Sequence, residues 1–256
     1  MIIPGLVSIA FRKLAPTEIV SLVSQADLQT IEWGGDIHVP HGNVRQARDV
    51  RRLTEDAGLT VAAYGSYYRL GSGESEGLAF QSVLDTAVAL GAPLIRVWAG
   101  TKVSADVDTA DWRTVVDESR RIAELAAAAG VVVAYEYHAG TFTDTLASTL
   151  QLLHEVNHPN MRSLWQPSQR NIADEEVHAL QQLLPFVINI HVFQWLAGRE
   201  ERQPLSDGTA SWRRYLDVLR RSGRNHHALI EFVCGDKPEA FLMDARTLRH
   251  WLQINE

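Results

Sequence analysis

Two glutamates follow strongly apolar stretches, where an unpaired charge is costly. Glu136 comes after residues 131–135 and Glu231 comes after residues 228–230. Charged side chains are buried when they pair with an opposite charge or bind a metal ion. Gln166 and His191 stand in comparable places after or within other apolar runs. Two carboxylates, an amide oxygen and an imidazole suit a divalent ion such as Mn²⁺, Co²⁺, Mg²⁺ or Zn²⁺, and the absence of a thiolate disfavours copper(I) or an iron–sulfur cluster. Pairing of each residue with an arginine or a backbone group is the alternative.

The elements that must position these side chains alternate regularly along the chain. Short apolar segments rich in β-branched residues predict strands near residues 6–10, 30–33, 60–64, 94–98, 131–137, 161–165, 187–192 and 228–232. Amphipathic segments between them predict helices near residues 16–25, 44–57, 77–90, 112–129, 145–156, 174–184, 211–222 and 238–253. Glycines close several of these helical segments, which agrees with helix ends in the left-handed conformation.

Strand followed by helix, repeated eight times, predicts a single (β/α)8 barrel domain over residues 1–256. An open doubly wound sheet is the alternative, and the lack of a Gly-x-Gly-x-x-Gly loop disfavours it. In such barrels the active site lies at the C-terminal ends of the strands. Glu136, Gln166, His191 and Glu231 fall at these ends of four consecutive strands, so we expect them to converge at one mouth of the barrel.

Composition narrows the function classes. The chain has 256 residues, 46% of them hydrophobic and 21% charged, and a formal net charge of −7. An acidic chain without a basic stripe is a poor partner for nucleic acid. Cys234 is the single cysteine, so we expect no internal disulfide and a cytoplasmic setting. We find no secretory signal pattern and no apolar run near the roughly 20 residues that span a bilayer. The sequence therefore predicts a protein without a membrane span.

Further polar and aromatic side chains are expected near the same rim as contacts for a substrate. They are Glu32, His38, Tyr68, Trp98, His138, Arg199 and Arg202. Aromatic faces suit the C–H bonds of a sugar, and arginines in a loop could clamp a phosphate or carboxylate. For each there is a structural alternative: Glu32 could form a salt bridge to Arg96, the histidines and arginines could be solvated, and the aromatics could pack in the barrel.

Several short stretches, in order and spanning nearly the whole chain, resemble the xylose-isomerase-like barrels, which include sugar isomerases, sugar epimerases and type 2 apurinic endonucleases. The stretches are Ile31-Glu32-Trp33, Leu90-Gly91-Ala92, Ile95-Arg96-Val97, Tyr135-Glu136-Tyr137-His138, Ile190-His191-Val192, Pro204-Leu205-Ser206-Asp207-Gly208, Trp212 and Ile230-Glu231-Phe232. The resemblance implies a metal held by Glu136, His191 and Glu231 together with an acidic residue. Gln166 stands where the family usually has that aspartate, and Gln169, a further expected substrate contact, stands where it often has histidine. A neutral amide is a weaker ligand for a hard cation, which implies lower metal affinity or a different metal.

The resemblance leads to a function hypothesis. We expect a metal-dependent isomerase or epimerase of a sugar or related keto-polyol, in which Glu136 and Glu231 remove and return a proton through an enediolate intermediate. A lyase or dehydratase on the same scaffold is one alternative, and a non-catalytic barrel that binds a small ligand after losing its metal is another. An apurinic-site endonuclease is disfavoured by Gln166, Gln169 and the net charge of −7. The expected partner is a small carbohydrate, with a homodimer as a candidate assembly.

Overall fold

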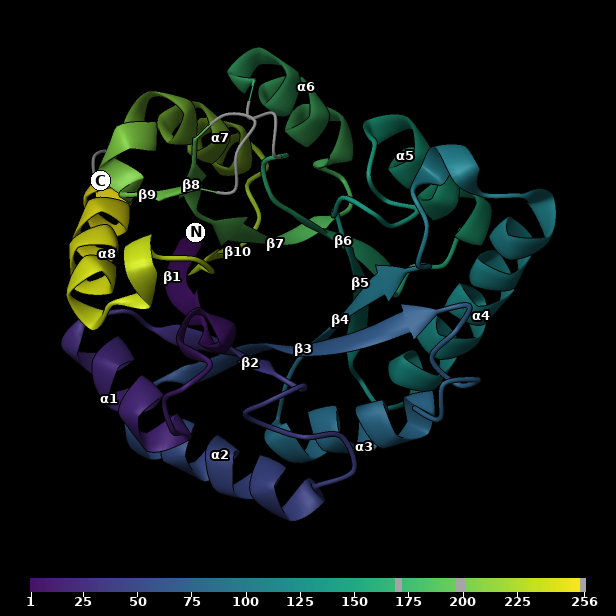
Figure 1. The fold of residues 1–256 in the computed structure, drawn as a ribbon, viewed down its shortest axis with the longest axis horizontal. Helices are drawn as coiled ribbons and strands as arrows, with labels where there is room; N and C mark the ends of the chain where they lie inside the picture. Colours follow the sequence, from purple (N-terminus) through teal and green to yellow (C-terminus); the bar gives the residue numbers. More distant parts are fainter. Residues whose placement is uncertain (169–171, 197–200, 254–256) are drawn as a thin grey trace.

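The computed structural model describes residues 1–168, 172–196 and 201–253. Eight parallel strands close into a barrel, in which β1 to β7 follow chain order and β10 completes the circle between β7 and β1. Eight α-helices surround this barrel in the described part of the chain (Figure 1). The predicted (β/α)8 fold is therefore confirmed.

The bounds of the elements are as follows. The barrel strands are β1 (Ile2–Val7), β2 (Thr30–Gly34), β3 (Thr60–Leu70), β4 (Leu94–Ala99), β5 (Val132–Glu136), β6 (Met161–Trp165), β7 (Val187–Val192) and β10 (His226–Ile230). The helices are α1 (Pro16–Gln25), α2 (Val44–Asp56), α3 (Phe80–Leu90), α4 (Thr109–Ala128), α5 (Leu146–Val156), α6 (Ala173–Leu183), α7 (Thr209–Arg221) and α8 (Pro238–Gln253). Short 3-10 turns lie at η1 (Ser8–Phe11), η2 (Ser104–Asp106), η3 (Leu205–Gly208) and η4 (Cys234–Asp236).

The first strand begins earlier than the apolar pattern predicts. The predicted strand near residues 6–10 leaves out residues 2–5, which include Pro4, and proline is rare in central strands. In the structure Pro4 is aligned with Ala228 of β10, and its carbonyl accepts a hydrogen bond from the Gln29 N–H at 3.0 Å. Proline lacks only the donor, so it is tolerated where the strand needs an acceptor. Residues 8–11 form the 3-10 turn η1 instead.

Packing separates two regions of the core. The apolar faces of the helices cover the outside of the barrel and form one large cluster of buried residues with it. Two smaller clusters are separate from it, one of Val7, Ile9, Ala62 and Leu229 and another of Ala63, Leu94 and Ala134. Alanine at several interior positions leaves room for larger polar side chains above them.

A bulge in β3 changes which of its side chains point toward the mouth of the barrel. The pairing register with β4 shifts between Gly65 and Tyr68. Tyr67 within the bulge has φ +56°, an unusual conformation for a residue other than glycine. The Ser66 hydroxyl stabilises the bulge by donating to the Arg96 carbonyl at 2.7 Å and accepting from the Tyr68 N–H at 3.2 Å. Bulges of this kind often re-aim a side chain beside an active site.

A small antiparallel hairpin follows β7. Its strands are β8 (Gln194–Trp195) and β9 (Arg202–Gln203). Arg202 forms an ion pair with Asp236 of η4 and lies 4.9 Å from the centre of the Phe232 ring, so the hairpin is attached to the loop after β10. The helices in the described ranges include none that is both long and apolar enough to cross a membrane.

Replacing Gly5 by alanine should weaken the barrel where β1, β2 and β10 meet. A Cβ at this position would lie 2.4 Å from the Thr30 carbonyl oxygen and 2.7 Å from Leu229 Cδ2. Because the carbonyl belongs to a neighbouring strand, we expect a loss of about 3 kcal/mol in the free energy of unfolding, the upper end for overpacking. The matched control is Gly130→Ala, where no heavy atom lies within 4 Å and φ is +71°, so only the backbone conformation costs about 1 kcal/mol. Urea unfolding of both variants measures the difference, and equal losses would contradict the steric argument.

Candidate metal centre and active site

The four residues predicted to bind metal do converge at the mouth of the barrel. Glu136 is the last residue of β5, Gln166 follows β6, His191 lies in β7, and Glu231 follows β10. These four strands are consecutive around the barrel. All four side chains are buried, with exposures between 0% and 7%. Strand order and the position of each residue in its strand therefore bring them together.

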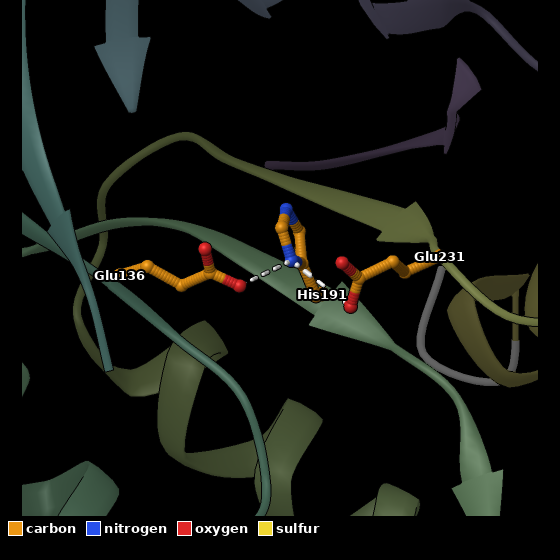
Figure 2. A group of neighbouring side chains, drawn as sticks. All are labelled: Glu136, His191 and Glu231. Atoms are coloured by element: carbon orange, nitrogen blue, oxygen red, sulfur yellow. Dashed lines mark ion pairs between the residues drawn. The ribbon is translucent and has the colours of Figure 1, made fainter. Parts of the chain in front are cut away.

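His191 lies between the two carboxylates (Figure 2). Its Nδ1 atom is 3.7 Å from Glu136 Oε1 and 3.3 Å from Glu231 Oε2. The three ligand atoms offered by these residues lie within 4.8 Å of one another. Such a spacing is wide enough to place an ion at about 2.0–2.3 Å from each atom.

Unsatisfied polar atoms at this place fit a metal ion. His191 Nδ1, Glu231 Oε2 and Gln166 Oε1 are buried and have no hydrogen-bond partner among the described residues. His191 Nδ1 and Glu231 Oε2 form an ion pair with each other at 3.3 Å, and the amide oxygen of Gln166 adds a third atom without a hydrogen bond. Buried polar atoms almost always have a hydrogen-bond partner, so three such atoms around one point require an explanation. Imidazole nitrogen, carboxylate oxygen and amide oxygen are all ligands of divalent cations. Glu136, Gln166, His191 and Glu231 would hold such an ion.

Gln166 keeps one end of its amide free. Its Nε2 donates to Glu136 Oε1 at 3.3 Å, which turns the amide oxygen away from that hydrogen bond. The side chain thus restrains Glu136 while its Oε1 atom stays available.

A buried arginine lies next to the metal residues. Arg96 of β4 is 1% exposed and donates from Nε to Glu32 Oε1 at 2.7 Å. It also forms a close ion pair through Nη1 with Glu136 Oε2, an atom that accepts a second hydrogen bond from Trp98 Nε1. Gly65 makes this arrangement feasible, because a Cβ there would lie 2.6 Å from Arg96 Nη2 and 2.8 Å from Glu32 Oε1. The structure thus bears out the salt-bridge alternative for Glu32.

These contacts shift the acidities of the buried groups. Burial by itself raises the pKa of Glu32, but Arg96 and His191 outweigh it and lower that pKa to about 2. The pKa of Glu136 is also lowered, because Arg96 and His191 together outweigh the effect of burial. Both carboxylates are therefore ionised at neutral pH.

His191 shows the opposite balance. Burial lowers its pKa, but the charges of Glu231 and Glu32 raise it to about 10. Its Nε2 lies 3.2 Å from Glu32 Oε2, which orients the ring and leaves Nδ1 facing the metal residues. Because a histidine binds metal only as neutral imidazole, a metal ion that binds here would displace a proton from His191.

A small pocket opens beside the metal residues. Its walls include Gln166 and Glu231 together with His138, Trp195 and Phe232. The ring of His138 is stacked on Trp98, with centroids 5.0 Å apart. Trp98 and His138 therefore lie close to Glu136, as predicted for substrate contacts, and their role remains an expectation. Asp144 also lines this pocket, and no sequence pattern had indicated it.

Comparison with known proteins assigns the fold family. A model of the family described as xylose isomerase-like TIM barrel matches residues 20–251. The chain belongs to this family. A curated relative, 3-dehydroshikimate dehydratase of Bacillus anthracis, is 38% identical over 103 residues, which cover 38% of this chain and 35% of the relative. The match therefore spans about a third of that relative's length.

Solved structures of the family have the same architecture. The probable 3-DHS dehydratase AsbF of Bacillus anthracis aligns with a TM-score of 0.78 at 23% identity, over 97% of this chain and 99% of the other. A D-allulose 3-epimerase from Methylomonas sp. aligns with a TM-score of 0.75 at 14% identity, over 98% of both chains. At these identities the alignments establish the shared fold alone.

Two predicted substrate contacts lie away from the pocket in this member of the family. The Tyr68 hydroxyl contacts Glu118 of α4, and its ring packs against Phe80 of α3, so this side chain points to the outer layer. His38 is 3% exposed, and its Nδ1 lies 2.9 Å from the Ser8 hydroxyl beneath the loop after β2. Alternation along β3 and tight packing after β2 explain both placements.

Other predicted contacts have different outcomes. Arg202 lies near the rim, but its guanidinium is already paired with Asp236. Gln169 and Arg199 lie outside the described residues. Tyr67 reaches the site in place of Tyr68: its ring lies 4.9 Å from Arg96 Cζ and 5.4 Å from the Trp98 ring. Its aromatic character was the only sequence signal, because nothing in the sequence predicts the bulge.

Purified protein should contain about one equivalent of a divalent metal, and the four residues should be needed to retain it. Elemental analysis should show the loss of this metal in Glu231→Gln, which removes one charge and one ligand oxygen. Gln166→Leu removes the whole amide, both the oxygen that faces the metal position and the Nε2 donor to Glu136, so we expect it to weaken metal binding about 10- to 100-fold, the size of effect known for residues that support a metal site. Glu201→Gln, at an exposed position in the hairpin, is the control. Unchanged metal content in Glu231→Gln would contradict the site.

Removing the charge of Arg96 should destabilise the protein more than removing a charge from its surface. Arg96→Met leaves Glu32 and Glu136 buried without their cation, so we expect a loss of about 3–5 kcal/mol in the free energy of unfolding. Arg45→Met on the exposed face of α2 is the control and should change that free energy by less than about 0.5 kcal/mol. Urea unfolding of metal-free protein measures both. Equal effects of the two substitutions would show that the buried charges do not depend on Arg96.

Proposed function

We propose that the chain is a metal-dependent dehydratase that eliminates water from a polyhydroxylated ketone. The observation that carries this proposal is the unequal state of the two carboxylates beside the metal residues. Glu136 is held by Arg96, Trp98 and Gln166, whereas the ion pair of Glu231 within the described residues is with His191. One carboxylate is thus restrained as an anion, and the other is available to take part in proton transfer.

Glu231 is the proposed general base. It would remove the proton from the carbon next to the substrate carbonyl. Lewis acidity toward the carbonyl oxygen, where negative charge develops as this proton leaves, is what a divalent ion held by the four residues would supply. Glu136 is a poor base because its lowered pKa disfavours protonation. Its part is to hold negative charge beside the metal position and to keep Trp98 in place through the indole N–H.

His138 is the proposed acid for the leaving group. It lines the same pocket as Glu231, and its Nδ1 lies 2.5 Å from the Ala139 carbonyl, so that Nδ1 carries a hydrogen and Nε2 can exchange a proton. Elimination breaks the C–H bond at one carbon and the C–O bond at the next. The electron pair forms the C=C bond, and the hydroxyl leaves as water with a proton from His138.

The sequence comparison supports the same reaction class. The curated relative that is 38% identical over 103 residues is named for the dehydration of 3-dehydroshikimate, a hydroxylated cyclic ketone with a carboxylate. That compound is therefore the first substrate to test. The small pocket beside Glu231, about 100 Å³, suits a compact substrate.

Epimerisation at the carbon next to a ketone is the second candidate. Glu136 and Glu231 approach His191 Nδ1 from two sides, at 3.7 Å and 3.3 Å, as two acid–base groups on opposite faces of one carbon would require (Figure 2). This reaction needs Glu136 to donate a proton, which its contact with Arg96 opposes. A weakly bound or displaced Arg96 would favour this candidate.

Incubation with 3-dehydroshikimate and Mn²⁺ should yield a product lighter by one water, detected by mass spectrometry. We expect Glu231→Gln to lower kcat by at least about 10²- to 10⁴-fold, because it removes the proposed general base and also one of the metal residues. His138→Gln should lower kcat while leaving the metal content unchanged, because His138 is not among the metal residues. The control is Arg45→Gln on the outer surface.

A parallel incubation with D-allulose in D₂O tests the second candidate. Deuterium at the carbon next to the carbonyl, without loss of water, would replace the dehydratase proposal by an epimerase. Absence of both reactions in protein loaded with metal would leave neither hydroxy-ketone supported as a substrate. The Glu231→Gln variant again serves to show that any exchange depends on the site.

A further inference from the structure

One arginine at the barrel mouth lacks a carboxylate partner. Arg69 lies near the end of β3 and is aligned with Trp98 of β4. It forms no ion pair with any described residue, whereas Arg12 is paired with Asp36 and Arg202 with Asp236. The charge of Glu76 acts on Arg69 from beyond ion-pair distance, but burial outweighs it and lowers the pKa of Arg69. Its contacts therefore indicate what it is positioned to meet.

The guanidinium of Arg69 is held by the indole ring of Trp98. Arg69 Cζ lies 4.1 Å from the centre of that ring, the geometry of a cation–π contact. The same indole donates to Glu136 and stacks with His138. The indole of Trp98 therefore contacts Arg69 as well as Glu136 and His138, the proposed acid.

The stacking fixes the orientation of the group without using its hydrogen-bond donors. A guanidinium has five N–H donors in a planar fork that matches a carboxylate or phosphate. Tyr67 packs against Trp98 from the bulge in the same strand, with ring centres 5.4 Å apart, and so restricts the movement of the indole. The backbone of β3 and the aromatic contacts together prepare Arg69 for an anion.

We propose that Arg69 binds an anionic group of the substrate, a carboxylate or a phosphate, while the rest of the substrate reaches Glu231 and the metal residues. This inference rests on the proposed function of the site and narrows its substrates to acidic hydroxy-ketones. Neutral keto-sugars lack the group that Arg69 would bind. Arg69 therefore acts as a specificity-determining residue.

The test compares acidic and neutral probes with three variants. The probes are 3-dehydroshikimate, which has a carboxylate, D-fructose 6-phosphate, inorganic phosphate, and neutral D-allulose. The variants are Arg69→Gln, which removes the charge, Arg69→Lys, which keeps the charge but loses the planar fork, and Arg45→Gln as a control with the same change in net charge. Binding is measured by calorimetry, KM and kcat are measured for any probe that reacts, and thermal unfolding verifies that each variant is folded.

We expect Arg69→Gln to weaken binding of one acidic probe, or to raise its KM, by about 10- to 100-fold, the range for hydrogen bonds to a charged group. The kcat should change less than KM, binding of D-allulose should not change, and Arg69→Lys should fall between wild type and Arg69→Gln. The acidic probe that responds identifies a carboxylate or a phosphate as the group. The control should match the wild type throughout.

Three outcomes would overturn the inference. The first is equal binding of every acidic probe by wild type and Arg69→Gln. The second is equal loss for acidic and neutral probes, which would show that Arg69 only supports Trp98. The third is that the wild-type protein binds none of the acidic probes more tightly than D-allulose. If an acidic probe binds through Arg69 but does not react, the proposed reaction is rejected and this inference is kept. If a probe reacts equally well with wild type and Arg69→Gln, the proposed reaction is kept and this inference is rejected.

Discussion

The buried ion pairs of Arg96 are the interaction on which the site depends. Three carboxylates, Glu32, Glu136 and Glu231, lie at the top of the barrel interior, where an unpaired charge is strongly disfavoured. Arg96 neutralises part of this charge through contacts with two of them. With His191 neutral, one divalent ion would complete the balance of charge. Without an ion, the same carboxylates keep His191 protonated by raising its pKa to about 10. A metal ion bound at this site would take the place of the proton on His191.

This polar layer determines the residues around it. Gly65 is needed because a side chain would enter the space of Arg96 and Glu32. Ala63 is paired with Glu32 and Ala134 with Arg96 in the neighbouring strands, where larger side chains would compete for volume with the charged ones. The bulge after Gly65 carries Tyr67 over the guanidinium of Arg96. Charged side chains, with glycine and alanine beside them, therefore occupy part of the interior that branched apolar residues usually fill in such barrels.

The barrel and the convergence of four polar side chains at its mouth could be predicted from the sequence, because both depend on regular spacing. Alternation of strands and helices leads to eight units, and Glu136, Gln166, His191 and Glu231 each stand at the end of an apolar run. The structure differs from the prediction where contacts between distant parts of the chain determine the local structure. Pro4 is within β1 because its carbonyl, and not its missing N–H, meets Gln29. Tyr68 points to the outer layer and Tyr67 to the site because a bulge, which has no clear sequence pattern, shifts the register of β3 against β4.

The glutamine at position 166 is consistent with this balance of charge. The resemblance to the family implied an aspartate and, with an amide instead, weaker metal binding. In the structure a fourth carboxylate beside Glu136 would exceed the charge that Arg96 and one divalent ion can neutralise. The amide instead donates from Nε2 to Glu136 Oε1 and keeps Oε1 unpartnered in the buried site. Arg96 also binds Glu32, which is not among the residues around the metal position. With an amide at position 166, the negative charges of Glu32, Glu136 and Glu231 would be balanced by Arg96 and one divalent ion. An amide at position 166 is therefore compatible with metal binding by the other three residues.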